Sequence, residues 1–101
     1  MGRERQIAGQ QGEERAVNYL TEVLGYSLLS RNFRTRDGEI DIILMDGETL
    51  VFVEVRTTRE KVFGPDSINF KKKQKMCKVA LKYLENLKRD YKRMRFDAVF
   101  V

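Results

Sequence analysis

Four charged side chains stand at the ends of two neighbouring apolar segments, where their types and spacing suit metal or phosphate chemistry. Glu39 and Asp41 open the first segment, and Glu54 and Arg56 close the second. Antiparallel pairing of the two segments brings all four together. Two carboxylates at the end of an apolar sheet face repel each other and lose hydration. The pair therefore requires a cation or a water-filled cleft.

The short connection between the segments decides whether the carboxylates share a face. Side chains alternate along a strand, so a loop with an even number of residues places Asp41 and Glu54 on one side of the sheet. Asp46, Gly47 and Glu48 offer two such turns, because Asp-Gly suits type I′ and Gly-Glu suits type II′. The Gly-Glu register sets the carboxylates directly opposite, the Asp-Gly register sets them diagonal, and a three-residue loop would separate them. The other face then takes an apolar set: Ile40, Ile42, Leu44, Val51, Val53 and Val55.

Two explanations fit this carboxylate pair. Arg56 lies two residues beyond Glu54 and can neutralise it as a salt-bridged strand end, the commoner outcome in an arbitrary hairpin. Alternatively, oxygen ligands from Asp41 and Glu54 hold Mg²⁺ or Mn²⁺, and water fills the remaining positions. The hairpin alone leaves both open.

A further carboxylate belongs to the predicted N-terminal helix, which runs from about Arg5 to Leu24. Glu13 precedes Ala16, Val17 and Leu20 by three, four and seven residues, so it lies along the core-facing stripe. A carboxylate there needs a partner. It is either a boundary residue bonded to an arginine or part of the same site as the hairpin carboxylates.

Composition narrows the chemistry further. A chain of 101 residues with 42% hydrophobic content is expected to form a single domain, residues 1–101. It has no histidine and only one cysteine, Cys77, which excludes a zinc cluster, a histidine base and a Ser-His triad. No apolar run reaches the length of a membrane span and no signal peptide is evident, so we expect a cytoplasmic protein without a membrane partner. The net charge of +5 indicates a polyanionic partner.

The remaining pattern predicts an α/β domain with a central mixed sheet, whose antiparallel hairpin is flanked by helices on both faces. We expect a strand at 26–30, an irregular basic stretch at 31–38 and a loop at 57–66. A helix should follow from Asp66 or Ser67 to about Leu87 or Arg89, and then a strand at 95–101. The last strand stops without a polar tail, which suggests that a C-terminal segment is missing.

The predicted second helix carries a lysine ridge, defined as Lys71, Lys75, Lys78 and Lys82. These positions fall at i, i+4, i+7 and i+11 and have almost no acidic partners at i+4, so the lysines repel one another. Phosphates would relieve that repulsion, and the alternative is an ordinary solvated face. The expected buried stripe of the same helix is Met76, Ala80, Tyr83, Leu84 and Leu87.

Six blocks in this order resemble the YraN family of predicted endonucleases, within the restriction-endonuclease-like superfamily and its PD-(D/E)XK signature, and are similar to archaeal Holliday junction resolvases. The blocks are GEERAVNYL (12–20), GEIDIILMD (38–46), VFVEVRT (51–57), FGPDSI (63–68), KKKQKMCKVALKYL (71–84) and RFDAVFV (95–101). The resemblance covers nearly the whole chain and implies a restriction-endonuclease-like fold.

The resemblance also implies roles for individual residues. Asp41 and Glu54 would bind Mg²⁺ together with the Val55 carbonyl, and Glu13 would act as a ligand through water or as an orienting acid. Arg56 stands where the superfamily usually has lysine; unlike lysine it does not lose its proton, which leaves it positioning water or stabilising phosphoryl charge.

The leading hypothesis is a metal-dependent endonuclease that hydrolyses DNA, with branched DNA as a candidate substrate. Its predicted nucleic-acid contacts are Arg31, Arg34, Arg36, the lysine ridge and, from the resemblance, Ser67 and Gln74. The alternative is a catalytically inactive nucleic-acid-binding module with the same fold. A third reading is a protein-interaction domain with a solvated basic face. The resolvase likeness also makes a homodimer plausible.

Overall fold

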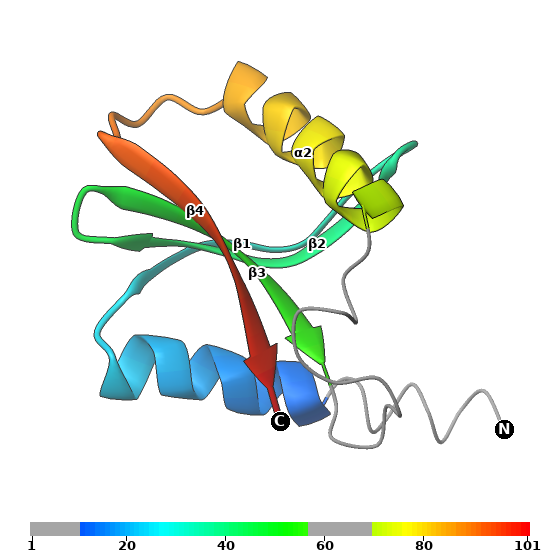
Figure 1. Ribbon diagram of the computed structural model, residues 1–101. Coiled ribbons are helices and arrows are strands. Elements are labelled where there is room, and N and C mark those ends of the chain that lie inside the picture. Colours follow the sequence, from blue (N-terminus) through cyan, green and yellow to red (C-terminus); the bar gives the residue numbers. More distant parts are fainter. Residues whose placement is uncertain (1–10, 57–69) are drawn as a thin grey trace, which may run out of the picture.

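The apolar hairpin forms the middle of a four-stranded mixed sheet. The computed structural model describes residues 11–56 and 70–101, in which the strands follow the order β1-β2-β3-β4. Neighbours pair antiparallel except for β3 and β4, which are parallel, as Figure 1 shows. The predicted mixed α/β architecture is confirmed. The strand bounds are β1 (Ser27–Thr35), β2 (Gly38–Asp46), β3 (Thr49–Arg56) and β4 (Arg93–Phe100).

The β2–β3 turn adopts the Gly-Glu register. Asp46 pairs with Thr49, which leaves Gly47 and Glu48 as a two-residue loop. Gly47 has φ of +58°, a left-handed conformation that glycine adopts without steric cost. The even loop keeps Asp41 in line with Glu54, as predicted.

The first helix covers one face of the sheet. Residues 11–18 are α-helical and continue into a π-helical turn, η1 (Tyr19–Val23), closed by a 3.1 Å bond from the Leu24 amide to the Tyr19 carbonyl. Gly25, at φ +75°, then ends the helix as expected. The predicted helix residues before 11 lie outside the described part of the chain. The buried cluster on this face comprises Ala16, Val17, Leu20, Ile42, Leu44, Val51 and Val53.

The second helix, α2 (Phe70–Glu85), covers the other face, mainly over β1 and β2 (Figure 1). Its stripe includes Val79, which is fully buried and which the predicted stripe omitted. The cluster it completes comprises Ile40, Ile43, Met45, Leu50, Phe52, Val79 and Ala80.

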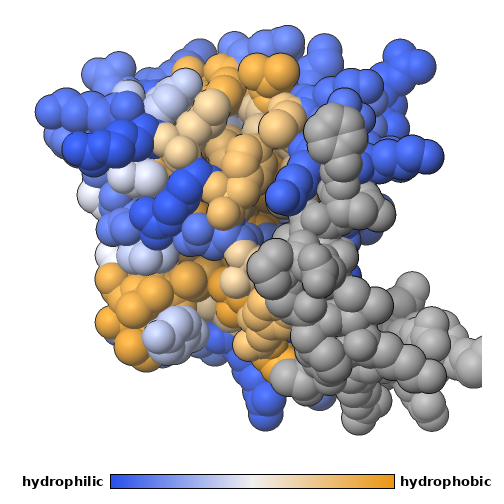
Figure 2. All heavy atoms as spheres, viewed as in Figure 1, coloured by the Kyte–Doolittle hydropathy of each residue, from blue (hydrophilic) through white to orange (hydrophobic). Residues whose placement is uncertain are grey.

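Strand β4 is left uncovered on the α2 side. Figure 2 shows hydrophobic surface between α2 and β4 in this view. Met94, Phe96 and Phe100 alternate along β4 and are 41–47% exposed, although Phe96 stacks on Phe52 with ring centroids 5.2 Å apart. The predicted C-terminal strand is therefore confirmed. Its alternating apolar side chains remain partly exposed on the α2 side of the sheet.

The basic stretch 31–38 is not irregular, and that prediction is wrong. Strand β1 continues through it and pairs with β2 as far as Thr35 and Gly38. The polar side chains there stand on an edge strand, so the sequence lacks apolar alternation, while the pairing with the buried strand β2 fixes the backbone.

The β1–β2 ladder is irregular at two places. Its register shifts between Leu28 and Ser30, and the pairing also skips Asn32, which has φ of +53°, and the opposite residue Asp41. Beyond this second place Ile40 packs in the cluster on the α2 side, although regular alternation predicted that it would join Ile42 on the other face. The pairs on either side keep the same register, so the change of face is a local break in the alternation along β2.

Within the described residues, no helix combines the length and the apolar character that a membrane crossing requires.

Candidate functional site

The predicted carboxylate pair lies where the β2–β3 ladder stops. The last recorded pair is Ile42 with Val53, and Asp41 and Glu54 occupy the next step. In Figure 1, β2 and β3 diverge on the side where α2 begins. The amide nitrogen of Val55 donates a 2.8 Å hydrogen bond to Oδ2 of Asp41. The Asp41 side chain thus accepts a hydrogen bond from a β3 amide that lies beyond the last β2–β3 pair. This hydrogen bond fixes the Asp41 carboxylate beside Glu54.

Glu54 is contacted by cations from two elements. Its side chain is 14% exposed, and Oε1 lies 3.7 Å from Nε of Arg56 on the same strand. Nζ of Lys72, from the first turn of α2, forms an ion pair with the same oxygen. The other oxygen, Oε2, is buried and has no hydrogen-bond partner among the residues that the structure describes. A buried carboxylate oxygen in that state is costly, because it has lost water without gaining a donor.

Two more carboxylates meet at Asn32. With its amide oriented to suit both neighbours, the Asn32 nitrogen donates to Oε1 of Glu39 at 2.8 Å and to Oε1 of Glu13 at 2.9 Å. The first helix and β2 are joined through this one side chain. Asparagine tolerates the left-handed backbone better than most residues, so the irregular position can also supply the bridging amide.

Glu13, Glu39, Asp41 and Glu54 form what we call the acidic cluster. The pKa of Asp41 is raised to about 6: burial raises it most, the charges of Glu13, Glu39 and Glu54 also raise it, and the Val55 amide opposes the shift. Burial also raises the pKa of Glu13, against the lowering effect of Arg31. The cations present do not cancel the repulsion within the cluster at Asp41.

The donor set fits a hard divalent cation. Carboxylate oxygens are the ligands that Mg²⁺ and Mn²⁺ take in proteins, and Oε2 of Glu54 is a buried acceptor to which no described residue donates. In the described part of the chain, no three acidic, cysteine or histidine side chains are grouped closely enough to hold a metal ion. Asp41 and Glu54 would therefore bind such an ion as a pair, with water completing the shell. The Val55 amide donates a hydrogen bond to Asp41, so Val55 positions the Asp41 carboxylate through its backbone nitrogen.

The predicted phosphate-binding residues are mostly on the surface. Nη1 of Arg31 is paired with Oε2 of Glu14 at 2.9 Å, and Nε of Arg34 lies 3.3 Å from Oε2 of Glu39. Arg36 is exposed in the turn between β1 and β2. The lysine ridge and Gln74 are exposed on α2, and Lys82 has an ion pair with Glu85 at 3.8 Å. Ser67 lies outside the described residues.

Sequence reasoning missed Lys72 and Asn32. A signal for Lys72 existed, because it precedes Met76, Val79 and Ala80 by four, seven and eight residues and so points along the buried stripe, as Glu13 does on its helix. This signal is not distinctive, because Lys72 stands in the middle of a run of three lysines. Nothing in the sequence distinguished Asn32 from other polar strand residues.

The fold and the cluster together define a class: an α/β protein whose mixed sheet is enclosed by two helices and carries clustered carboxylates where its central ladder ends. The family model described as "Uncharacterised protein family UPF0102" matches residues 12–101. A UPF0102 protein from Thermodesulfovibrio yellowstonii is 44% identical over 92% of this chain and 83% of its own length. One from Persephonella marina is 48% identical over 94% and 83%.

The chain belongs to the UPF0102 family, which is the YraN family that the motifs indicated.

Proposed function

We propose that this protein is a metal-dependent endonuclease with a restriction-endonuclease-like fold, acting on DNA phosphodiesters. The observation that supports it best is the position of Asp41 beside Glu54, at the point where the central ladder stops and four carboxylates gather. Ordinary strand ends do not bury an acceptor such as Oε2 of Glu54 without a donor. A divalent cation would remove both the repulsion and the unsatisfied acceptor.

The chain's own residues divide the work of hydrolysis between them. Asp41 and Glu54 would hold Mg²⁺ or Mn²⁺, which when bound supplies Lewis acidity toward a phosphate oxygen and acidifies water. The Val55 amide keeps the Asp41 carboxylate oriented. Arg56 has only donor groups on its guanidinium, so it serves as a donor to phosphoryl oxygens rather than as a base. Lys72 places a second positive charge beside the same carboxylate.

The positive charge on the surface of α2 supports binding of a partner that carries phosphate groups. The lysine ridge is exposed along α2, and the first turn of α2 carries Lys72, which forms an ion pair with Glu54. A strand of DNA on the ridge would therefore lead to the acidic cluster. Its affinity should fall steeply with salt, because each bound phosphate releases counterions.

The test combines metal binding with cleavage. Mn²⁺ is titrated calorimetrically into the wild type and into Asp41→Ala/Glu54→Ala, and both proteins are incubated with linear and branched DNA in Mg²⁺. We expect saturable binding and cleavage in the wild type and neither in the double variant. Glu22→Ala/Asp90→Ala removes two exposed carboxylates outside the cluster and should preserve both. A wild type that binds no metal would overturn the proposal.

The inactive binding module is the second candidate, and the ion pairs of Glu54 favour it. Arg56 and Lys72 already approach Oε1, which makes the site partly self-neutralised. This alternative predicts salt-dependent DNA binding that is retained in Asp41→Ala/Glu54→Ala, with no cleavage by the wild type in either metal.

A further inference from the structure

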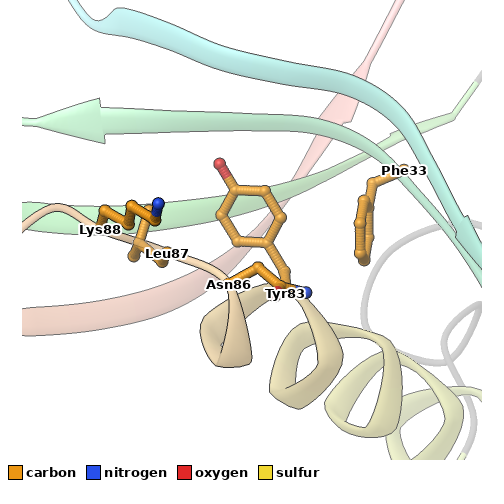
Figure 3. Close-up of a pocket in the computed structure, with 5 residues that line it drawn as sticks. All are labelled: Phe33, Tyr83, Asn86, Leu87 and Lys88. Atoms are coloured by element: carbon orange, nitrogen blue, oxygen red, sulfur yellow. The ribbon is translucent and has the colours of Figure 1, made fainter.

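A small pocket opens at the end of α2 that lies away from the acidic cluster. Its volume is about 170 Å³, and Figure 3 shows the ring of Tyr83 standing between Phe33 and the Leu87–Lys88 segment. Phe33 comes from β1 and meets Tyr83 edge to face, with centroids 5.1 Å apart. The pocket is smaller than the 300–1,000 Å³ typical of drug-sized ligands, which limits an occupant to a compact ring system.

The lining combines flat apolar walls with a polar rim. Phe33, Tyr83 and Leu87 provide aromatic and aliphatic surface. Asn86 and Lys88 are exposed at the rim and offer an amide and an ammonium group. An aromatic ring with hydrogen-bonding edges and an attached phosphate matches this set: the ring stacks on the walls, its edge meets the amide, and the phosphate meets the ammonium. Burial raises the pKa of Tyr83, so its hydroxyl stays neutral beside such a ring.

The lysine ridge leads to this pocket. Lys75, Lys82 and Asn86 are related by i, i+7 and i+11, so Asn86 continues the basic stripe at the last turn of the helix. Tyr83 belongs to the core-facing stripe of the same helix, and Asn86 lies on the boundary between that stripe and the ridge. At 1.5 Å rise per residue, the ridge from Lys71 to Lys82 spans roughly 16 Å. A strand whose phosphates follow the ridge would present its next bases at the pocket.

We propose that this pocket binds one unpaired nucleobase of a nucleic-acid strand whose phosphates lie on the lysine ridge. The inference rests on the proposed nucleic-acid function and names its substrate class: strands with at least one unstacked base, as single strands and branch points have. In a continuous duplex the bases are stacked and turned away from such a surface, so duplex DNA would use the ridge alone.

The test compares a single-stranded oligonucleotide with the blunt duplex of the same sequence, using the full chain and fluorescence anisotropy. Tyr83→Leu keeps apolar volume and removes the ring. We expect it to weaken single-strand binding about 5- to 100-fold, the effect of losing one stacked base, and to leave duplex binding unchanged. Tyr83→Phe keeps the ring and should bind as the wild type does. Tyr91→Leu makes the same change at an exposed tyrosine outside the pocket and should have no effect.

Tyr83 also packs near Phe52, so thermal unfolding must show that Tyr83→Leu is folded. If it is not, the exposed rim is tested instead: Asn86→Ala/Lys88→Met should weaken single-strand binding more than duplex binding. Equal losses for both DNA forms, or no loss in either variant, would overturn the pocket inference while DNA binding by the ridge still stood. A wild type that binds neither form would overturn the nucleic-acid function itself, and this inference with it.

Discussion

The two ends of the central hairpin carry charged clusters that differ in how completely their groups are satisfied. At the turn end, the Arg95 guanidinium donates to Asp46, Asp97 and the Tyr26 hydroxyl, each at 3.0 Å. It also lies over the Tyr26 ring, 5.7 Å from the centroid. These partners raise the pKa of Arg95, which means that they stabilise its charged form.

The acidic cluster at the other end shows the opposite balance. Burial and the charges of Glu13, Glu39 and Glu54 raise the pKa of Asp41, and within the described residues one oxygen of Glu54 has no donor although two cations lie beside the other. The same residue types thus stabilise one end of the hairpin and strain the other. Selection for stable folding alone would remove such charge repulsion, so the repulsion is typical of sites that bind a ligand. The difference between the two ends is the strongest physical argument that the acidic cluster is functional.

Removal of Arg95 should give the largest loss of stability. Arg95→Met breaks three hydrogen bonds and leaves two carboxylates without their partner. Because the Arg95 side chain is 37% exposed, solvent screens part of the effect, and we expect a loss of about 2 kcal/mol in the free energy of unfolding. Urea denaturation measures it. Arg93→Met, on the same strand with an exposed side chain, is the control and should change stability by less than about 0.5 kcal/mol.

Removal of the Asp41 charge should act in the opposite direction. The folded-state pKa of Asp41 is about 6, against 3.8 for a solvent-exposed aspartate, so the folded protein holds this proton more tightly than the unfolded chain does. The wild type therefore loses stability as pH rises through this window. Asp41→Asn stays neutral and can still accept the Val55 hydrogen bond. In chelator at pH 8 we expect it to be more stable than the wild type by about 1 kcal/mol, after discounting for solvent.

The pH dependence distinguishes this explanation from simple repacking. The stability difference between Asp41→Asn and the wild type should shrink as the pH falls below 6 and approach zero below about pH 3, where Asp41 is protonated in both the folded and the unfolded state. Thermal unfolding across the pH series gives the profile. An asparagine variant that is less stable than the wild type at pH 8 would show that the carboxylate is structurally satisfied, and the contrast between the two ends would fail.

The hairpin and its carboxylates were predictable because their determinants are local. A two-residue turn and strand alternation sufficed to place Asp41 and Glu54 on one face, the structure selected the directly opposite register from the two that the turn allowed, and helical spacing sufficed to expose the lysine ridge. These rules use only residues near one another in sequence.

The remaining parts of the site depend on contacts that local rules do not contain. The second half of strand β1 was predicted to be irregular because its residues are mostly polar, but its pairing with β2 makes it a strand. Asn32 becomes a bridge only once Glu13 and Glu39 approach from two other elements. The burial of β4 likewise depends on how far α2 extends over the sheet, and α2 stops short of it. The assignment to the restriction-endonuclease-like fold remains a proposal that rests on motif resemblance.

Substitution of Lys72 tests the contrast between the two ends of the hairpin, because its small effect should be unfavourable in chelator and favourable in Mn²⁺. In chelator, Lys72→Met removes a cation from the nearly buried Glu54 carboxylate, and we expect a stability loss of about 0.5 kcal/mol. In Mn²⁺ the same change should help, because the ammonium no longer occupies Oε1, an oxygen that the metal would use. Calorimetry should then show several-fold tighter Mn²⁺ binding than in the wild type. Lys73→Met, at an exposed neighbouring position, serves as the control for the loss of one positive charge.

The sign of that change separates two roles for the same ion pair. If Lys72 is a stand-in for a divalent cation, its removal weakens the metal-free protein and strengthens metal binding. If Lys72 is a permanent partner, as the inactive binding module implies, its removal costs stability in both conditions and Mn²⁺ restores nothing. A loss that persists in saturating Mn²⁺ would therefore class the Glu54–Lys72 pair with the Arg95 network, as a structural contact at the other end of the same hairpin.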